Sequence, residues 1–251
     1  MNYSIINAEL ESKIFGKDTF FSILHSAFLD ETIGNPIAVS FVNPFSYSQI
    51  DEHIVRSIDY WFSDGALLCR LTNMSRTVPV ERLSFDFSSI AGDVFSYANE
   101  HDLKVAIIGG NASEIDKCSD YLKQNYPGLK LVYTRDGYFD SAKLPLVSSE
   151  LLDSEPDIVI AGLGTPLQEQ FILDAKSKLN RACLLFTCGG FLTQTASRGD
   201  YYHPVIKKLG LRWMQRAVMH KHVRDRLFRD YPKFVCKYLF DLIKKKIGLV
   251  K

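Results

Sequence analysis

One aspartate stands in a stretch where its carboxylate could act as a base. The segment DYWFSDGALLCRL, residues 59–71, passes from an aromatic run into Asp64 and a glycine, and then into an apolar helical pattern. A carboxylate at the end of a strand can take the proton from an attacking hydroxyl, which contributes about 10²–10⁴-fold to a reaction rate. An aspartate before an apolar helix is also a common N-cap. Spacing alone leaves both roles open.

A second stretch places two polar side chains at the start of a helix. In GLGTPLQEQFI, residues 162–172, Pro166 suits the first helical turn, which brings Gln168 and Glu169 to the carboxyl edge of the preceding strand. Gln168 could there hydrogen-bond a sugar or a nucleotide. The alternative is that Gln168 is solvated and that Glu169 only complements the helix dipole.

Two glycine-containing turns also follow strands. RDGYF, residues 135–139, offers Tyr138 for stacking on a nucleobase, and a tyrosine of the core or of a turn is the ordinary alternative. IIGGN, residues 107–111, allows either close backbone approach to an anion or a simple tight turn. Because IIGGN lacks the GxGxxG spacing, it gives no support to a nicotinamide cofactor.

The C-terminal fifth of the chain is strongly basic. Residues 201–251 hold 14 Lys or Arg against 3 Asp or Glu, whereas residues 1–200 hold 16 against 26. This asymmetry favours an anionic partner for the tail, such as phosphate, nucleic acid or a membrane surface. Arginine suits two-pronged phosphate binding, although a solvated face is the ordinary alternative for a run of charges. The candidate side chains are Arg216, Lys221, Arg224, Arg226 and Arg229.

The last segment has the pattern of a basic amphipathic helix. Residues 231–251 carry apolar side chains at intervals of three and four, with lysines at 244–246. Such a helix can lie in a membrane interface, and packing on its own domain or on another subunit is an equal alternative. No run reaches about 18–20 apolar residues, and the start of the chain lacks the pattern of a signal peptide. We therefore expect a cytoplasmic protein that contacts the inner membrane face peripherally.

Metal and cofactor motifs are missing from the sequence. The five cysteines include no CxxC pair, and neither HExxH nor DxD occurs. A disulfide framework and a zinc site are therefore disfavoured, and a reducing compartment fits. The sequence predicts no metal and no cofactor. A nucleic-acid partner is disfavoured because residues 1–200 are acidic and no recognition motif is present.

The elements that would position these side chains alternate along the chain. Alternation of strands and helices predicts an α/β fold with a Rossmann-like, mostly parallel sheet and helices on both faces. Ligands of such sheets bind at the carboxyl ends of the strands. Residues 1–200 would form this catalytic domain, and 201–251 a basic helical appendage. The expected strands are 36–43, 60–63, 104–110, 129–134, 157–164 and 182–190, and the expected helices 18–31, 46–58, 64–73, 88–101, 112–125, 143–153 and 166–179.

Eight motifs, taken in order, carry a family resemblance. They are SFVNP, FSDG, ERLSFDF, VAIIGG, YPGLKLV…GYF, DIVIAGLGTPLQEQFI, CGGF and KKLGLRWMQR, and the match extends over about residues 36–229. This series resembles the WecG/TagA/CpsF glycosyltransferases, glycosyltransferase family 26. The resemblance implies an inverting, metal-independent transferase in bacterial cell-surface polysaccharide synthesis. Its donor would be a UDP-sugar and its acceptor a sugar on a polyprenyl-diphosphate lipid, with homo-oligomerisation a further expectation.

The resemblance also implies roles for single residues. The family's proposed general base falls on Asp64. The donor-binding positions implied are Asn43, Gly109, Gly137, Tyr138, Gln168, Glu169 and Thr193. The positions implied for the acceptor and its diphosphate are Ser40, Arg82, Arg216, Arg224, Arg226 and Arg229.

The sequence departs from the family pattern at three places. Ser63 replaces the usual proline before Asp-Gly, Thr193 replaces an aspartate, and Arg212 replaces a glutamate. These changes leave the transferred sugar open, so mannosaminyl transfer is not assumed. They also motivate an alternative, a nucleotide-sugar-binding or assembly subunit that has lost catalysis.

Overall fold

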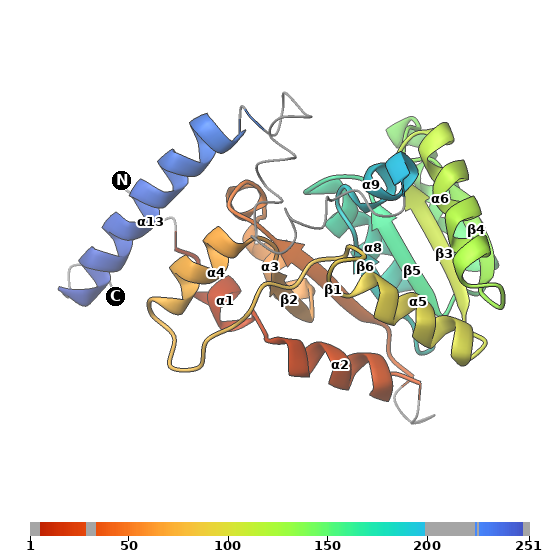
Figure 1. The fold of residues 1–251 in the computed structure, drawn as a ribbon, viewed down its shortest axis with the longest axis horizontal. Helices are drawn as coiled ribbons and strands as arrows, with labels where there is room; N and C mark the ends of the chain where they lie inside the picture. The colour runs from red at the N-terminus through yellow and green to blue at the C-terminus, as the bar shows by residue number, and fades with distance from the viewer. Residues whose placement is uncertain (1–5, 29–33, 199–223, 225, 248–251) are drawn as a thin grey trace.

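The strands of the computed structural model form one parallel sheet with helices on both faces (Figure 1). The structure describes residues 6–28, 34–198, 224 and 226–247. The six strands lie in the order β2-β1-β6-β5-β3-β4, and all the pairs are parallel, which confirms the predicted fold class. The strands are β1 Ile37–Val42, β2 Tyr60–Ser63, β3 Lys104–Gly109, β4 Lys130–Arg135, β5 Ile158–Gly162 and β6 Leu184–Thr187.

The helices divide between two hydrophobic clusters, one on each face of the sheet. The first face packs against α1 Ala8–Ser12, α3 Glu52–Ser57, α4 Ala66–Asn73, α7 Leu144–Asp153, α8 Leu167–Lys178 and α13 Tyr231–Lys246. The second face packs against α2 Lys17–Ser26, α5 Ala91–Glu100, α6 Ala112–Asn125 and α9 Phe191–Arg198. Three short turns complete the described elements: η1 Ser46–Ser48, η2 Ser141–Lys143 and η3 Arg226–Asp230.

The covered sheet explains the continuous apolar strands of the sequence. In β3, Val105 and Ile107 lie in the second cluster, whereas Ala106 and Ile108 lie in the first, and all four are 0% exposed. Successive side chains of a strand point to opposite faces, so a strand buried on both faces needs apolar residues throughout.

Two expected helices differ from the structure near the site. The helix expected over 46–58 is interrupted, because Asp51 Oδ1 accepts the N–H of Ile54 at 2.8 Å and caps a new helix there. The helix expected from residue 64 begins at Ala66, because Gly65 adopts a φ of 111° that no helix contains. The short helices α1 and α9 were not expected from the sequence pattern.

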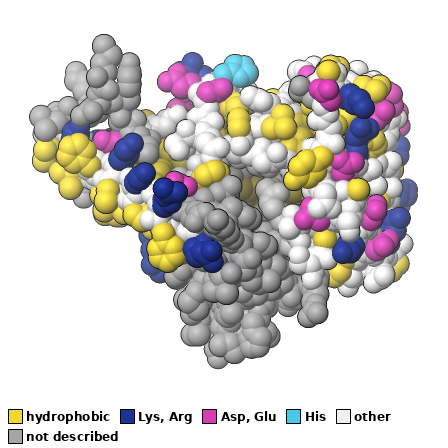
Figure 2. All heavy atoms as spheres, turned by 90° about the horizontal axis from the view of Figure 1, so that it is seen from above, with side chains coloured by type: hydrophobic (Ala, Val, Ile, Leu, Met, Phe, Trp, Pro, Cys, Tyr) yellow, Lys and Arg dark blue, Asp and Glu magenta, His cyan; other side chains and the backbone are white. Residues whose placement is uncertain are grey.

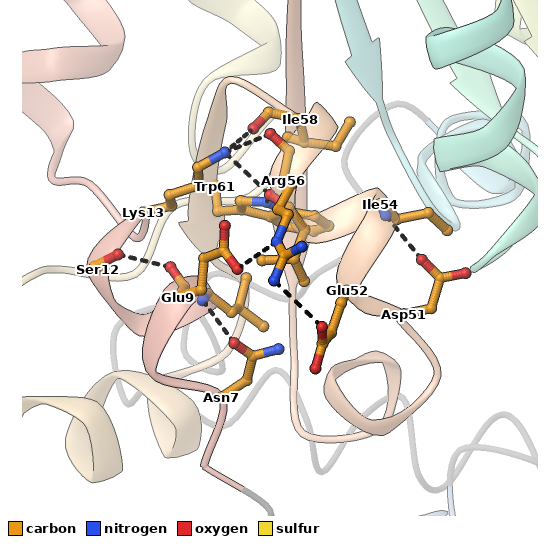
Figure 3. A network of polar contacts seen from close by, with 12 residues as sticks. Asn7, Glu9, Ser12, Lys13, Asp51, Glu52, Ile54, Arg56, Ile58 and Trp61 are labelled. Carbon is orange, nitrogen blue, oxygen red and sulfur yellow. Dashed lines mark hydrogen bonds and ion pairs between the residues drawn. The ribbon is translucent and has the colours of Figure 1, made fainter. Parts of the chain in front are cut away.

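Polar contacts join α1 and its C-cap Lys13 to α3 (Figure 3). Asn7 Oδ1 accepts the N–H of Leu10 at 3.0 Å and caps α1. The Lys13 ammonium then satisfies the carbonyl oxygens at the end of α3, a position where cations are favoured. Those oxygens belong to Val55, Arg56 and Ile58, at 3.1, 2.7 and 3.0 Å. This clamp fixes the chain that enters β2.

Helix α13 buries one face and exposes the other. Phe234, Tyr238 and Leu242 are at most 5% exposed and belong to the first cluster. The Tyr238 hydroxyl donates to Glu11 Oε1 at 2.8 Å, which ties α13 to α1. The buried face of α13 therefore packs on its own domain, which was one of the alternatives for residues 231–251. Within the described ranges, we find no helix with the length and apolarity that crossing a bilayer requires.

Candidate functional site

The loops that follow β1 and β2 meet at the carboxyl edge of the sheet. The Asp64 N–H donates to Val42 O at 2.8 Å, so the chain after β2 runs beside the end of β1. The Leu83 N–H donates to Ser63 O at 2.9 Å, which lays the segment before α5 against the same edge. Asp64 and its neighbour Arg82 therefore lie at the edge where parallel sheets bind ligands.

Asp64 is not the cap of α4. The N-cap of this helix is Gly65, and among the described residues no side chain caps it. The Asp64 carboxylate instead faces Arg82, whose Nη2 lies 3.5 Å from Asp64 Oδ1. The Asp64 side chain is 29% exposed, so it is accessible from the edge. The exposed part of the carboxylate lies at this edge, and the role of Asp64 as a base stays a prediction.

Arg82 is held by a compact polar cluster on the 82–88 loop. Its Nη2 donates to Asp86 Oδ2 at 2.7 Å and also contacts the Ser84 hydroxyl. The Ser84 hydroxyl donates to Asp86 Oδ2 at 2.7 Å, and the Ser88 N–H donates to Asp86 Oδ1 at 2.8 Å. Asp86 thus anchors the guanidinium between itself and Asp64.

The charge of Asp86 is stabilised by these contacts. Burial by itself would raise the pKa of the Asp86 carboxyl, because a low-dielectric surrounding disfavours the charged form. The Arg82 guanidinium and the hydroxyls of Ser84 and Ser88 outweigh burial, and the pKa is lowered overall. Asp86 is therefore ionised at neutral pH, and Arg82 keeps a permanent partner.

A second polar cluster lies buried between β1, β6 and α8. Glu169 Oε1 accepts from the Ser40 hydroxyl at 3.0 Å, from Thr165 Oγ1 at 3.2 Å and from Gln168 Nε2 at 2.9 Å. Ser40 Oγ and Thr187 Oγ1 are 2.8 Å apart and share a hydrogen bond. Burial raises the pKa of the Glu169 carboxyl. Its Oε2 is buried without a hydrogen-bond partner in the described part of the chain.

The buried cluster links loops at the carboxyl edge of the sheet, and its side chains are shielded from solvent. Ser40 and Glu169 are 0% exposed and Gln168 is 4% exposed. Gln168 Oε1 accepts the N–H of Gly189 at 3.2 Å, so the cluster links the β5–α8 loop to the turn before α9. Direct ligand contact by these side chains stays a prediction.

The glycines of the edge allow three loops to touch. A Cβ at Gly109 would lie 2.4 Å from Gly162 O, and one at Gly137 would lie 3.0 Å from Gly109 Cα. The Gly137 N–H donates to Gly110 O at 2.8 Å. Gly109 and Gly137 are therefore required for packing, which accounts for both glycines without a ligand and leaves their predicted donor contact untested.

Three other predicted donor positions differ in accessibility. Tyr138 is 81% exposed, so it is no core tyrosine, and its ring is available for stacking. Asn43 Oδ1 accepts the N–H groups of Phe45 and Ser46, at 2.9 and 3.1 Å, and shapes the turn after β1. Thr193 is half-buried in α9.

The predicted basic residues of the tail are only partly described. Arg216 lies outside the described residues, as does the Arg212 departure from the family pattern. Arg226 begins η3, and Arg224 and Arg229 are exposed.

Among the described residues, no three His, Cys, Asp or Glu side chains lie closely enough together to hold a metal ion.

Sequence reasoning missed the residues that hold the predicted ones. Asp86 and Ser84 position Arg82, and Thr165 and Thr187 complete the buried cluster. The motif ERLSFDF contains both Ser84 and Asp86, so an arginine followed four residues later by an aspartate was an available signal. Thr187 gave no such signal, since 147 positions separate it from Ser40.

Known proteins resemble this chain over most of its length. It is 44% identical over 211 residues, 82% of this chain and 87% of the relative, to a UDP-Gal:alpha-D-GlcNAc-diphosphoundecaprenol beta-1,4-galactosyltransferase of Shigella boydii. An N-acetylglucosaminyldiphosphoundecaprenol N-acetyl-beta-D-mannosaminyltransferase of Bacillus subtilis (strain 168) is 25% identical over 98% of this chain and 92% of its own. A protein of that same name from Staphylococcus aureus (strain MW2) is 23% identical over 93% of this chain and 87% of its own length.

The family profile agrees with these pairwise similarities. The description "Glycosyl transferase WecG/TagA/CpsF family" matches residues 24–248, which include both polar clusters and α13. The resemblance inferred from the eight motifs is thereby confirmed. The chain belongs to the WecG/TagA/CpsF family of glycosyltransferases.

Proposed function

We propose that this protein transfers a hexose from a UDP-hexose to an N-acetylhexosamine carried on a polyprenyl diphosphate, with inversion at the anomeric carbon. The observation that carries the proposal is the accessible Asp64 carboxylate beside Arg82, at the carboxyl edge of the sheet in a chain of this family. The product would be a lipid-linked disaccharide for bacterial cell-surface polysaccharide.

The proposed chemistry is a single displacement. The acceptor hydroxyl attacks the anomeric carbon, Asp64 takes the hydroxyl proton, and the bond from the anomeric carbon to the diphosphate oxygen breaks to release UDP. Developing negative charge on the leaving diphosphate needs cations or aligned N–H groups. Arg82 and the N-terminus of α9, which follows Gly189 and Gly190, are the described groups suited to that task.

We propose that the donor nucleotide and the acceptor occupy different parts of the sheet edge. Asp64 follows β2 and lies beside Arg82, whereas the predicted donor-binding Gly109 ends β3 and Gly137 follows β4. Four inter-strand steps separate β2 from β3, a distance of about 19 Å. A nucleotide sugar placed along this edge would have its base near Tyr138 and its sugar toward Asp64.

Galactose is the sugar that the comparisons favour. The Shigella boydii relative is named for UDP-Gal and for a β-1,4 linkage, and it is 44% identical to this chain, against 25% for the mannosaminyltransferase of Bacillus subtilis. Displacement on an α-linked nucleotide sugar gives a β-linked product, so the β linkage in that name agrees with inversion. We therefore propose UDP-galactose as the donor.

We also propose that the protein reaches its lipid acceptor as a peripheral membrane protein. The outer face of α13 exposes Phe240, Ile243 and Ile247, at 56, 57 and 63%. Figure 2 shows hydrophobic side chains interleaved with Lys and Arg at the α13 end of the molecule. This pattern suits an interfacial helix at an anionic bilayer.

A transfer assay tests the proposal. The full chain is incubated with UDP-galactose and a short-chain GlcNAc-diphosphate lipid, and disaccharide and UDP are measured together. We expect Asp64→Asn to lower kcat by about 10²-fold or more while UDP still raises the melting temperature. Asp153→Asn, an exposed residue at the end of α7, serves as the control.

Two results would contradict the proposal. Near-normal turnover of Asp64→Asn would remove the base assignment. UDP binding by the wild-type chain without transfer from any UDP-hexose would favour the alternative of a nucleotide-sugar-binding subunit without catalysis.

A further inference from the structure

Exposed hydrophobic side chains gather at one end of the molecule. Among the described residues, ten large hydrophobic side chains are exposed, and five of them lie on α13 with its C-cap or on the loop after α4. The loop contributes Met74 at 53% and Val78 at 75% exposure. Figure 1 places this loop and the C-terminal part of α13 at the end of the molecule opposite β4.

A polar hollow joins the loop to α13. Its volume is about 350 Å³, and it is lined by Glu11, Ser12, Ser75, Arg76, Thr77, Val78 and Lys245. The Arg76 guanidinium donates to the carbonyl oxygens of Glu11 and Ile14, at 2.8 and 2.6 Å, so its charge is fixed at the wall. The lining thus combines two cations and three hydroxyls with one carboxylate.

The carboxylate of the hollow is engaged on its inner side. Glu11 Oε1 accepts the hydroxyls of Tyr47 and Tyr238, at 3.0 and 2.8 Å. Burial raises the pKa of the Glu11 carboxyl. The two cations Arg76 and Lys245 outnumber this one carboxylate in the lining. The charge of the lining therefore favours a small anionic group such as a phosphate ester.

We propose that the 74–79 loop and the outer face of α13 form one lipid-facing surface, whose hollow takes the phosphate of an anionic lipid headgroup. The flanking side chains Val78 and Ile247, at 75 and 63% exposure, then enter the apolar region of the bilayer. A free phosphate ion would use Arg76 and Lys245 but would leave these apolar side chains in water. The proposal rests on the proposed function only in requiring that the protein works at a membrane.

This surface lies close to the base. Helix α4 connects the two, since Asp64 stands just before it and Met74 just after it. Eight residues of α-helix span about 12 Å. A diphosphate-linked sugar that projects from the bilayer would therefore need to reach only about one short helix length from the headgroups to Asp64.

Vesicle sedimentation tests the surface with the full-length protein. The probes are phosphatidylcholine vesicles with and without phosphatidylglycerol. We expect Val78→Asp to weaken binding to the anionic vesicles about tenfold, because the variant cannot bury that side chain in the bilayer. Lys245→Glu is expected to weaken binding to anionic vesicles alone. Leu146→Asp, a change at a residue 58% exposed on α7, is the matched control and should bind normally.

Three results would overturn the inference. These are wild-type vesicle binding by Val78→Asp, equal weakening by Leu146→Asp, or undiminished binding of Lys245→Glu to the anionic vesicles. Val78→Asp should keep wild-type turnover on a water-soluble short-chain acceptor, and loss of that turnover would also count against the inference. Failure of the proposed function would show separately, as absent transfer to that acceptor by the wild-type chain.

Discussion

Replacing Asp86 by asparagine should lower activity through Arg82, although Asp86 contacts no substrate in the proposed reaction. The Asp86 carboxylate accepts from Arg82 Nη2 at 2.7 Å, from Ser84 Oγ at 2.7 Å and from the Ser88 N–H at 2.8 Å. Asparagine removes the charge and one acceptor site. The guanidinium would then turn toward Asp64, which lies 3.5 Å away, and pair with the base.

The stability cost of Asp86→Asn follows from the burial of the pair. The Asp86 and Arg82 side chains are 12 and 25% exposed, so solvent screens their interaction only in part. Hydrogen bonds to charged groups contribute about 1.5–3 kcal/mol each, and we expect a loss of about 2 kcal/mol in unfolding free energy. The folded pKa of Asp86 is lowered, so its contribution is present above the unfolded pKa and is lost as pH falls through the folded value. The difference between wild type and variant should therefore shrink below about pH 4.

The assay compares kcat/KM with denaturant unfolding on the same samples. Misplacing a catalytic neighbour by about 1 Å can cost about 10²-fold, so we expect kcat/KM to fall about 10–100-fold. Asp157→Asn is the matched control, because Asp157 pairs with Arg181 at 2.9 Å and is 23% exposed, but it precedes β5 at the amino edge of the sheet. Wild-type kcat/KM in Asp86→Asn, or an equal loss in Asp157→Asn after correction for the folded fraction, would refute the reasoning.

Three further predictions concern the supports of the site. Glu169→Leu should lose about 1–3 kcal/mol of unfolding free energy, because three donors lose their acceptor. Glu169→Gln should gain stability relative to wild type as pH rises above the ordinary glutamate pKa of about 4.3, because the raised pKa of Glu169 penalises its ionised form. Urea unfolding at several pH values measures both, and equal stability of the two variants would contradict this. Gly109→Ala should lose about 3 kcal/mol or more, because its Cβ would meet Gly162 O and its φ is 139°. Gly164→Ala should lose only about 1–2 kcal/mol, because its Cβ would meet nothing within 4 Å. Thermal melts that rank the two variants in the reverse order would refute the packing role. Tyr238→Phe should lose about 1 kcal/mol of unfolding free energy, because it loses the hydrogen bond to Glu11. Phe240→Ala on the exposed face should change the unfolding free energy by less than about 0.5 kcal/mol. An unchanged unfolding free energy in Tyr238→Phe would show that this bond does not hold α13.

The sequence itself determined the sheet and the place of the site along the chain. The six strands lie within three residues of their expected ends. The inner strands are buried on both faces and must be apolar throughout, and turn residues bound them. The edge strand β4 is only partly buried. Parallel strands joined by helices bring their carboxyl ends to one edge, so Asp64, Tyr138 and Gln168 could be placed near that edge from order alone. The amphipathic pattern of 231–246 likewise predicted the helix, since it depends on neighbours within one turn.

Only the tertiary structure decided which groups those residues contact there. Whether Asp64 caps α4 or faces Arg82 depended on the φ of Gly65 and on the loop that carries Arg82, 18 residues away. Likewise, α13 packs against its own domain because Tyr238 reaches Glu11 across 227 positions of sequence. The local sequence pattern predicts the hydrogen bonds and the apolar face within one helix or strand. A contact between elements depends on the path of the whole chain. Such a contact joins residues that are far apart in the sequence, so the local pattern around one partner does not indicate the other.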